Sequence, residues 1–139
     1  MVIQLQDSDL PLVLDFKFKK YEEAGRCRLP AGWRENSLAQ YRNLYLEGKC
    51  QHLGYRMENR VVALAGALLC DEIPFLCTKP VCHGIFVDEY ALPGYRSPDI
   101  AGQLRANLHV WLVENGARLS ATIPPNNARL ACAAGNLRW

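Results

Sequence analysis

The sequence predicts an α/β fold, a single-domain mixed β-sheet flanked by helices in the order βααββ-loop-βαβα. Apolar residues recur at helical spacing early in the chain, and near residue 51 the pattern changes to that of strands. Val61–Cys70 is apolar enough for a central strand buried on both faces. A strand, a turn and a capped helix then follow between Gly84 and Leu104. We expect one domain over residues 1–139, because a chain of this length can bury its own core.

The first strand and two helices precede that change of pattern. Val2–Gln6 alternates apolar and polar residues, as a strand does. Asp7–Asp9 can cap a helix that Gly25 ends. The residues assigned to its solvent side are Asp15, Lys17, Lys19, Lys20, Glu22 and Glu23. A second helix is predicted over Ser37–Glu47, where Gly48 ends it.

The middle of the chain reads as a hairpin followed by a long loop. The strand-like runs Gln51–Met57 and Val61–Cys70 are joined by turn residues. Residues 71–81 contain two prolines and are predicted to form an irregular excursion, a kind of loop that is often functional. The next strand is His83–Asp88, and residues 90–98 form a turn-rich link.

The clearest helix follows this link. Ser97 is a good N-cap, Pro98 suits the first helical position, and Asn115–Gly116 ends the helix. Its apolar stripe consists of Ile100, Leu104, Leu108, Trp111 and Leu112. Leu119–Ile123 is predicted as a further strand, and residues 126–134 as a short alanine-rich helix.

Charge and hydropathy exclude several classes of protein. The 16 basic and 14 acidic residues give a net charge of +2 and a pI near 8.2, whereas nucleic-acid-binding domains usually exceed a pI of about 9. The longest apolar stretch has ten residues, and a membrane helix needs roughly 20. The N-terminus lacks the basic region of a secretory signal. We therefore expect a cytoplasmic protein that binds neither nucleic acid nor membrane.

The six cysteines form no CxxC pair, so in a reducing cytosol we expect free thiols. Zinc could in principle use Cys70, Cys77, Cys82 and His83. The spacing argues against such a site, because zinc pairs normally lie roughly two to four residues apart. Adjacent Cys82 and His83 would also point to opposite faces of a strand. We predict no metal site.

The segment Gly84–Leu104 carries the strongest functional signal. A loop that leads into a helix N-terminus directs backbone N–H groups and the positive end of the helix dipole at one spot, which suits a phosphate or pyrophosphate. The same pattern also fits an ordinary capped turn, which every α/β protein contains.

The order of the elements and their local residues resemble the Gcn5-related N-acetyltransferase (GNAT) superfamily over nearly the whole chain. Members carry an apolar strand, a loop and helix of the pattern V-x-P-x-Y-R-G-x-G-I/V-A/G-x-x-L, another strand and an Asn-initiated helix. The corresponding segments here are Asp9–Pro11, Glu58–Val62, Tyr95–Leu104 and Pro125–Arg129. No single motif is intact, so the resemblance rests on order and spacing.

The resemblance implies transfer of an acetyl group from the co-substrate acetyl-CoA to an amine of a small molecule or peptide, by direct attack in a ternary complex. It implies that the pantetheine arm pairs with the backbone of Ile85, Phe86 and Val87, and that Asn127 approaches the coenzyme from the last helix. The expected pyrophosphate contacts are Arg96, Ser97, Asp99, Ile100 and Ala101.

Such a transfer needs a group that takes a proton from the attacking ammonium. Glu89 and Asp88 are preferred by their position beside the strand's end, and a solvated loop acid is the alternative interpretation of either. The remaining candidates are His83, Asp71 and Glu72. Tyr95 and Tyr90 could donate a proton to the leaving thiolate, or simply pack. The family's usual tyrosine on the last helix is replaced here by Ala131.

Two departures from the family pattern bear on coenzyme binding. Asp99 stands where a central glycine is usual, so that a carboxylate would face the pyrophosphate. Pro98 removes one backbone donor from the loop. A catalytically degenerate GNAT-fold binding or regulatory module is therefore the alternative function, and an unrelated small-ligand binder that uses residues 71–81 is a third. An edge strand and apolar loop residues such as Phe75 and Leu76 favour a homodimer.

Overall fold

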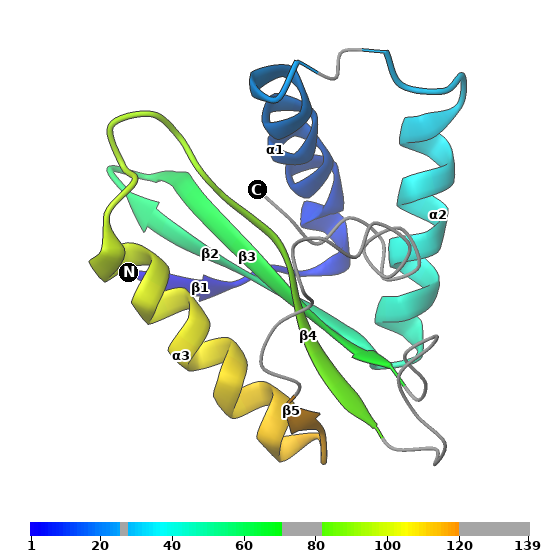
Figure 1. The fold of residues 1–139 in the computed structure, drawn as a ribbon, viewed down its shortest axis with the longest axis vertical. Coiled ribbons are helices and arrows are strands. Elements are labelled where there is room, and N and C mark those ends of the chain that lie inside the picture. Colours follow the sequence, from blue (N-terminus) through cyan, green and yellow to red (C-terminus); the bar gives the residue numbers. More distant parts are fainter. Residues whose placement is uncertain (26–27, 71–81, 120–139) are drawn as a thin grey trace.

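The computed structural model describes residues 1–25, 28–70 and 82–119 (Figure 1). In chain order its elements are β1 (Val2–Gln4), the short 3-10 helix η1 (Asp7–Asp9), α1 (Leu10–Glu23), α2 (Trp33–Leu46), β2 (Cys50–Met57), β3 (Arg60–Cys70), β4 (His83–Ala91), α3 (Pro98–Glu114) and β5 (Arg118–Leu119). Over these residues the strands form a five-stranded sheet in the order β1-β2-β3-β4-β5. Helices α1 and α2 lie on one face of the sheet and α3 on the other (Figure 1). The predicted α/β class is confirmed.

The sheet is mixed, as predicted. β1, β2, β3 and β4 pair in antiparallel fashion with their neighbours, whereas β4 and β5 are parallel. The turn at residues 58–60 joins β2 to β3, and both Glu58 and Asn59 take positive φ there. Parallel neighbours need a crossover connection, which α3 supplies between β4 and β5.

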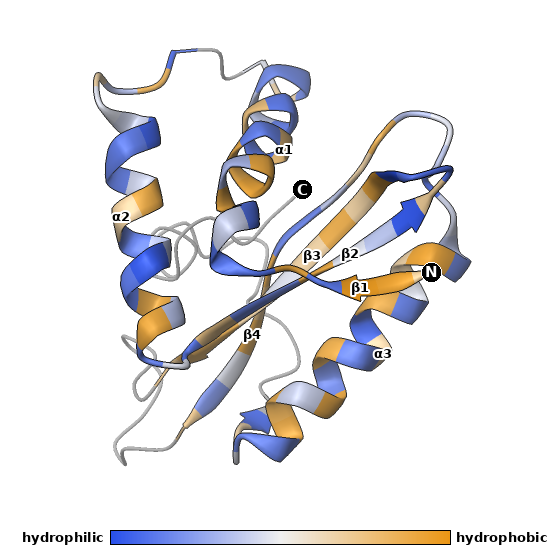
Figure 2. Ribbon diagram, turned by 180° about the vertical axis from the view of Figure 1, so that it is seen from behind, coloured by the Kyte–Doolittle hydropathy of each residue, from blue (hydrophilic) through white to orange (hydrophobic). Residues whose placement is uncertain are grey.

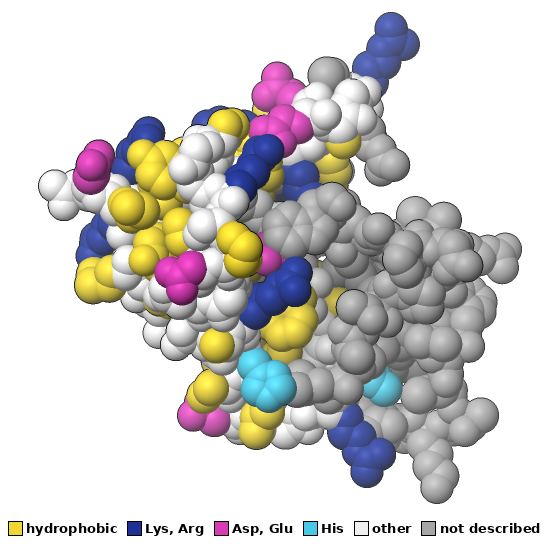
Figure 3. All heavy atoms as spheres, turned by 60° about the vertical axis from the view of Figure 1, so that its left-hand side comes forward, with side chains coloured by type: hydrophobic (Ala, Val, Ile, Leu, Met, Phe, Trp, Pro, Cys, Tyr) yellow, Lys and Arg dark blue, Asp and Glu magenta, His cyan; other side chains and the backbone are white. Residues whose placement is uncertain are grey.

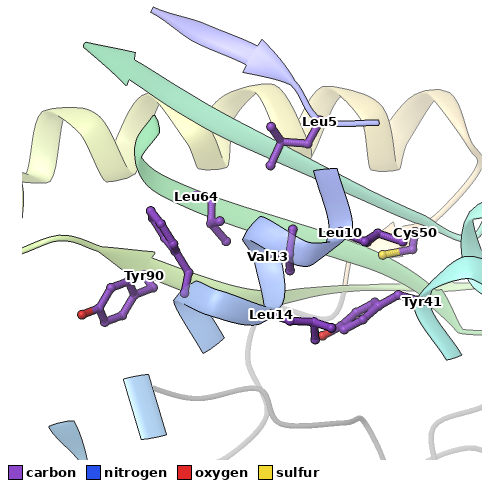
Figure 4. Close-up of a cluster of buried hydrophobic side chains, with 9 residues drawn as sticks. Leu5, Leu10, Val13, Leu14, Tyr41, Cys50, Leu64 and Tyr90 are labelled. Atoms are coloured by element: carbon purple, nitrogen blue, oxygen red, sulfur yellow. The ribbon is translucent and has the colours of Figure 1, made fainter. Parts of the chain in front are cut away.

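Strand β3 is buried on both faces because its side chains alternate between two cores. One core lies under α1 and α2, and Figure 4 shows Leu64 of β3 there among side chains of both helices. The other core lies under α3, where Leu104, Leu108 and Leu112 are fully buried. The small residues Ala63, Ala65 and Ala67 of β3 belong to this second core. Figure 2 shows the hydrophobic residues recurring along α1 and α3.

Several element boundaries differ from those predicted. α2 begins at Trp33, four residues before Ser37, after Gly32 in the left-handed conformation (φ 77°). β1 ends at Gln4 because Gln6 takes part in the capping box that starts η1. Lys17, assigned to the solvent side of its helix, is buried. β4 continues beyond Asp88 to Ala91 through a bulge.

Parts of the prediction lie outside the described residues. These parts are the excursion over residues 71–81, most of the strand Leu119–Ile123 and the helix over residues 126–134, which includes Asn127 and Ala131. β5 begins at Arg118, one residue before the predicted strand. The homodimer stays a prediction, since Phe75 and Leu76 are not described. Within the described ranges no helix is long and apolar enough to cross a membrane.

The leucine side chains buried on the inner face of α3 stabilise the packing of this helix on the sheet. We expect Leu108→Ala to lower the free energy of unfolding by about 2–5 kcal/mol, because the side chain is fully buried and its loss leaves a cavity. Val110→Ala on the exposed face of the same helix should change it by no more than about 0.5 kcal/mol. Urea denaturation measures both, and equal losses would contradict this packing.

Candidate active site

One edge of β4 has only a short partner strand among the described residues, and we refer to the remainder as the open edge. Over these residues β5 pairs with β4 at His83 and Gly84. From Ile85 to the end of the strand, no described strand pairs with that edge. The chain then turns through residues 92–97 into α3, so the open edge and the N-terminus of α3 follow one another along the chain. Unpaired backbone N–H and C=O groups at such an edge can pair with an extended ligand.

A bulge interrupts β4 at the middle of this edge. Val87 pairs with Gly66 and Tyr90 with Leu64, so Asp88 and Glu89 together oppose Ala65. Asp88 takes a left-handed backbone conformation (φ 57°) that residues other than glycine seldom adopt. Because the bulge breaks the alternation of side chains, the two neighbouring acids meet different elements: Asp88 meets α1, α2 and β2, and Glu89 meets α3.

The carboxylate of Asp88 is enclosed by three polar side chains, and only 1% of it is exposed. Lys17 Nζ of α1 lies 3.2 Å from Oδ1 as an ion pair without the alignment of a hydrogen bond. The Tyr41 hydroxyl of α2 donates to Oδ2 at 2.5 Å. Nε2 of His52 on β2 lies 2.9 Å from the same oxygen. Asp88 thus connects three elements that are distant in sequence.

This enclosure makes Asp88 a poor proton acceptor. Burial raises the pKa of Asp88, but the charge of Lys17 and the hydrogen bond from His52 outweigh it and hold the pKa below its usual range. A general base works best when its pKa is close to the operating pH. Burial also raises the pKa of Tyr41 well above its ordinary value, so its hydroxyl stays a donor. Asp88 is therefore suited to structure rather than to proton transfer.

Glu89 has the opposite electrostatic character. It is largely buried, and Nη2 of Arg105 on α3 donates to Oε2 at 2.6 Å. Burial raises the pKa of Glu89, and the hydrogen bonds and charge of Arg105 counteract that rise only in part. The charge of Lys20 on α1 also acts on Glu89. A largely buried carboxylate with a raised pKa, bound by Arg105 of α3, has the properties of a general base.

The loop before α3 satisfies many of its own backbone donors. The N–H of Tyr95 donates to Leu92 O at 3.0 Å, and the N–H of Ser97 donates to Tyr95 O at 3.1 Å. Ser97 Oγ accepts from the N–H of Ile100 at 3.1 Å, which confirms Ser97 as the N-cap. Ala101 N–H donates to Ser97 O at 3.2 Å. The helix N-terminus is therefore capped from within the chain.

Arg96 is held by α1. Its Nη2 lies 2.7 Å from both carboxylate oxygens of Glu23, and its Nε donates to Ala91 O at 2.9 Å. Its guanidinium lies over the ring of Tyr90, whose hydroxyl also donates to Glu23. The Tyr90 hydrogen bond and then that of Arg96 lower the pKa of Glu23. Since the ion pair between Arg96 and Glu23 is exposed, a competing anion can replace Glu23 at a low cost in free energy.

Two of the other predicted site residues, Asp99 and Tyr95, lie at this loop, and His83 lies at the opposite end of β4. Asp99 accepts a hydrogen bond from Gln103 Nε2 at 3.1 Å, within α3. The Tyr95 hydroxyl accepts from Arg60 Nη2 at 3.0 Å, next to the β2–β3 turn. His83 is the first residue of β4, at the end that pairs with β5. Figure 3 shows basic and acidic side chains interspersed with hydrophobic ones over the face that it draws.

No protein-family model matches the sequence. No curated protein matches it either.

Solved structures do match. A predicted acetyltransferase from Clostridium acetobutylicum, determined with acetyl-CoA, gives a TM-score of 0.74 over 100% of this chain and 90% of that one, at 14% identity. A GCN5-related N-acetyltransferase from Ralstonia eutropha gives 0.62 over 97% and 90%, at 21% identity. An aminoglycoside 6'-N-acetyltransferase from Acinetobacter haemolyticus gives 0.66 over 99% and 91%, at 16% identity. The chain has the GNAT acetyltransferase fold.

The buried partners of Asp88 in this GNAT fold were not among the residues predicted from sequence. Lys17 follows Val13 and Leu14 at helical spacing, so it lies on the apolar face, where a lysine is a signal of a buried ion pair. His52 is likewise a polar residue within a strand whose neighbours are buried. Tyr41 is the buried residue of α2. Their mutual contacts depend on pairing across the fold.

Among the described residues, no group of three or more His, Cys, Asp or Glu side chains is arranged to hold a metal ion. Cys50, Cys70 and Cys82 are free thiols. Cys77, the remaining thiol of the zinc hypothesis, lies outside the described residues.

The ion pair makes Asp88 a testable determinant of stability. We expect Asp88→Asn to lower the free energy of unfolding by about 3–5 kcal/mol at neutral pH, because Lys17 then stays buried without its counter-charge. The folded-state pKa of Asp88 lies below the unfolded value of about 4, so the wild type has this stabilisation above that pH and loses it as the pH falls through the folded-state pKa. The difference between the two proteins should therefore shrink in acid.

Urea titrations at several pH values measure that difference. Asp15→Asn is the matched control, because Asp15 forms an exposed ion pair with Arg34 and should change stability by less than about 1 kcal/mol. A pH-independent loss at Asp88, or a loss as large at Asp15, would contradict the assignment.

Proposed function

We propose that the protein is an acyl-CoA-dependent N-acetyltransferase, which moves an acetyl group from acetyl-CoA to the amine of a small molecule or peptide. The open edge of β4 is the observation that carries this proposal. It combines a strand edge that no described strand pairs with from Ile85 onward and a helix N-terminus directly beyond it, in a fold whose structural neighbours include acetyltransferases determined with acetyl-CoA and with coenzyme A. The acceptor class rests on neighbours that are aminoglycoside N-acetyltransferases.

The pantetheine arm is assigned to the open edge. Its amide groups can pair with the backbone of Ile85, Phe86 and Val87, as an added strand would. The pyrophosphate is assigned to the start of α3, where the helix dipole favours an anion. Its proposed contacts are Arg96, Ser97, Asp99, Ile100 and Ala101, and Asn127 is a further proposed contact outside the described residues. In this assignment the pyrophosphate replaces Glu23 as the partner of Arg96.

The reaction forms a C–N bond and breaks the C–S bond of the thioester. The acceptor loses a proton to Glu89, whose raised pKa suits this step. Its neutral amine attacks the acetyl carbonyl, and coenzyme A leaves as a thiolate that must gain a proton. Tyr95 is the proposed donor, with Tyr90 as the second hydroxyl on the same segment. Asp88, predicted as an alternative base, instead stabilises the strand that carries Glu89.

A specific observation favours a second function, a binding or regulatory module without transfer. Arg96 is bound to Glu23, and Ser97 already caps the helix. Pro98 lacks an N–H group, and Asp99 adds a negative charge where the phosphates would lie. These features oppose an anion at this site, so thiol release measured together with coenzyme affinity distinguishes the two functions.

Glu89→Gln tests the proposed base. Turnover should fall by roughly 10²- to 10⁴-fold, because an amide cannot accept the proton, while acetyl-CoA affinity stays unchanged. Thiol release over a panel of amines and titration calorimetry with coenzyme A measure the two quantities. Glu47→Gln, at an exposed site beyond α2, is the control for loss of one carboxylate. Firm coenzyme binding without thiol release from any amine would favour the regulatory module.

Asp99 should weaken coenzyme binding through its charge. We expect Asp99→Gly and Asp99→Asn each to tighten acetyl-CoA binding several-fold, since a near-surface charge interaction is worth on the order of 1 kcal/mol. The asparagine variant removes the charge without freeing the backbone, so a gain only in the glycine variant assigns the effect to backbone freedom. Titration calorimetry measures both, and unchanged affinity in both would place the phosphates elsewhere.

A further inference from the structure

The ring of His52 is fully buried and held from two sides. Its Nε2 lies 2.9 Å from Asp88 Oδ2, and its Nδ1 lies 2.8 Å from the Tyr45 hydroxyl. The ring stacks on Tyr45 with an interplanar angle of 13° and meets Tyr41 edge-on at 76°. Both tyrosines belong to α2, so His52 joins that helix to the bulge of β4.

The hydrogen bonds around His52 fit one arrangement of hydrogens. The Tyr45 hydroxyl accepts from the backbone N–H of His52 at 3.0 Å, which directs its own hydrogen to Nδ1. The ring hydrogen then lies on Nε2 and is donated to Asp88. On the other side, Tyr41 accepts from Lys17 Nζ at 2.7 Å and donates to the same carboxylate oxygen. Both tyrosine hydroxyls and both ring nitrogens of His52 therefore have a partner in this hydrogen-bond network.

A second ring proton would disturb this arrangement. It would deprive the Tyr45 hydrogen of its acceptor and place another cation beside Lys17, with one carboxylate to balance both. The groups that face the ring are Tyr41 and Tyr45 from α2, Cys50 from its own strand, Asp88 from β4 and, through Asp88 and Tyr41, Lys17 from α1. A ring hydrogen on Nε2 fits the contacts with all of them.

The order Cys50, His52, Asp88 resembles a nucleophilic triad, but the geometry excludes that role. Cys50 Sγ lies 3.8 Å from Nδ1, which already accepts from Tyr45. Burial raises the pKa of the Cys50 thiol far above its usual range, so no thiolate forms. The ring therefore acts on Asp88 rather than on a nucleophile.

The strand opposite the bulge makes room for the ring. His52 pairs with Gly66 on β3, and Gly66 pairs with Val87, the residue before the bulge. A Cβ atom at Gly66 would lie 2.5 Å from Cδ2 of His52. The ring of His52 thus occupies the space that a side chain at position 66 would fill, so this position requires glycine.

We propose that His52 is a positioning residue for acetyl transfer. Its Nε2–H holds Asp88 in the left-handed conformation, which few residues other than glycine adopt unaided, and this conformation directs the Glu89 side chain to Arg105 on the α3 side of β4. Tyr45 sets the hydrogen of the ring, and Gly66 provides its space. The inference rests on the proposed function, because Glu89 is the group that the bulge positions.

The hydrogen position is tested without any assay of activity. Nitrogen NMR of uniformly labelled protein at about pH 7 should show His52 with hydrogen on Nε2 and a bare Nδ1. His109→Gln, at an exposed histidine of α3, assists the assignment. Hydrogen on Nδ1 alone overturns the hydrogen bond from Nε2 to Asp88, and hydrogen on both nitrogens overturns the role of Tyr45 in setting the ring hydrogen, whether or not the protein is an active transferase.

The effect on transfer is tested with variants of the full chain. His52→Leu removes the donor and should lower kcat roughly 10- to 100-fold with an unchanged KM for acetyl-CoA, as expected for a misplaced catalytic group. His52→Gln retains an amide N–H donor and should recover most of that loss, whereas His109→Gln should change nothing. Wild-type kcat in His52→Leu, or equal losses in the leucine and glutamine variants, overturns the proposal.

Two further measurements separate the possible failures. If His52→Leu does not fold, Tyr45→Phe provides the test, because it removes only the hydroxyl that sets the ring hydrogen. Its NMR spectrum should then show hydrogen on Nδ1 in part of the molecules, and an unchanged spectrum overturns the inference. Calorimetry with coenzyme A on the wild type tests the proposed function by itself, since the hydrogen bonds of His52 and Asp88 go to residues outside the coenzyme loop.

Discussion

The left-handed backbone of Asp88 is the constraint on which the candidate site depends. An ordinary strand would alternate its side chains, and consecutive acids would then follow the regular pattern of the sheet. The bulge breaks this pattern and lets Asp88 enter the α1–α2 side while Glu89 reaches Arg105 on α3. A purely local feature, one positive φ angle, thereby decides which carboxylate is enclosed under α1 and α2 and which one meets Arg105 of α3.

The same constraint explains why charged residues are tolerated in the core. Burial of a lysine or an aspartate by itself is very unfavourable, and the two are compatible with folding only as an ion pair whose members also have hydrogen bonds to neighbouring side chains. Tyr41 and His52 complete the hydrogen bonds of the carboxylate oxygen that Lys17 does not pair with. Because these partners come from α1, α2 and β2, the group also fixes how those elements sit against β4. Specific geometry, rather than net stability, is what such a network supplies.

The coenzyme loop contains groups that favour an anion and groups that oppose one. Its helix N-terminus and Arg96 favour an anion, while Glu23, Asp99 and the Ser97 cap already satisfy or oppose those donors. All of these opposing contacts are exposed or local, so a ligand can displace them at modest cost. The buried network around Asp88 cannot be exchanged in this way. The contacts at the bulge are therefore buried and fixed, whereas those at the loop are exposed and can be replaced by a ligand.

The sequence alone determined the α/β class, the order of the elements and the start of α3, because periodicity, caps and breakers are local properties of the chain. It also identified Asp88 and Glu89 as the acids to consider. It could not separate their roles, since it placed both beside the end of a strand that continues through a bulge to Ala91. Lys17 was misplaced because local helical periodicity does not reveal a partner 71 positions away. Only the tertiary structure decided which groups meet, because the enclosure of Asp88 arises from side chains that three other elements, α1, α2 and β2, bring to β4.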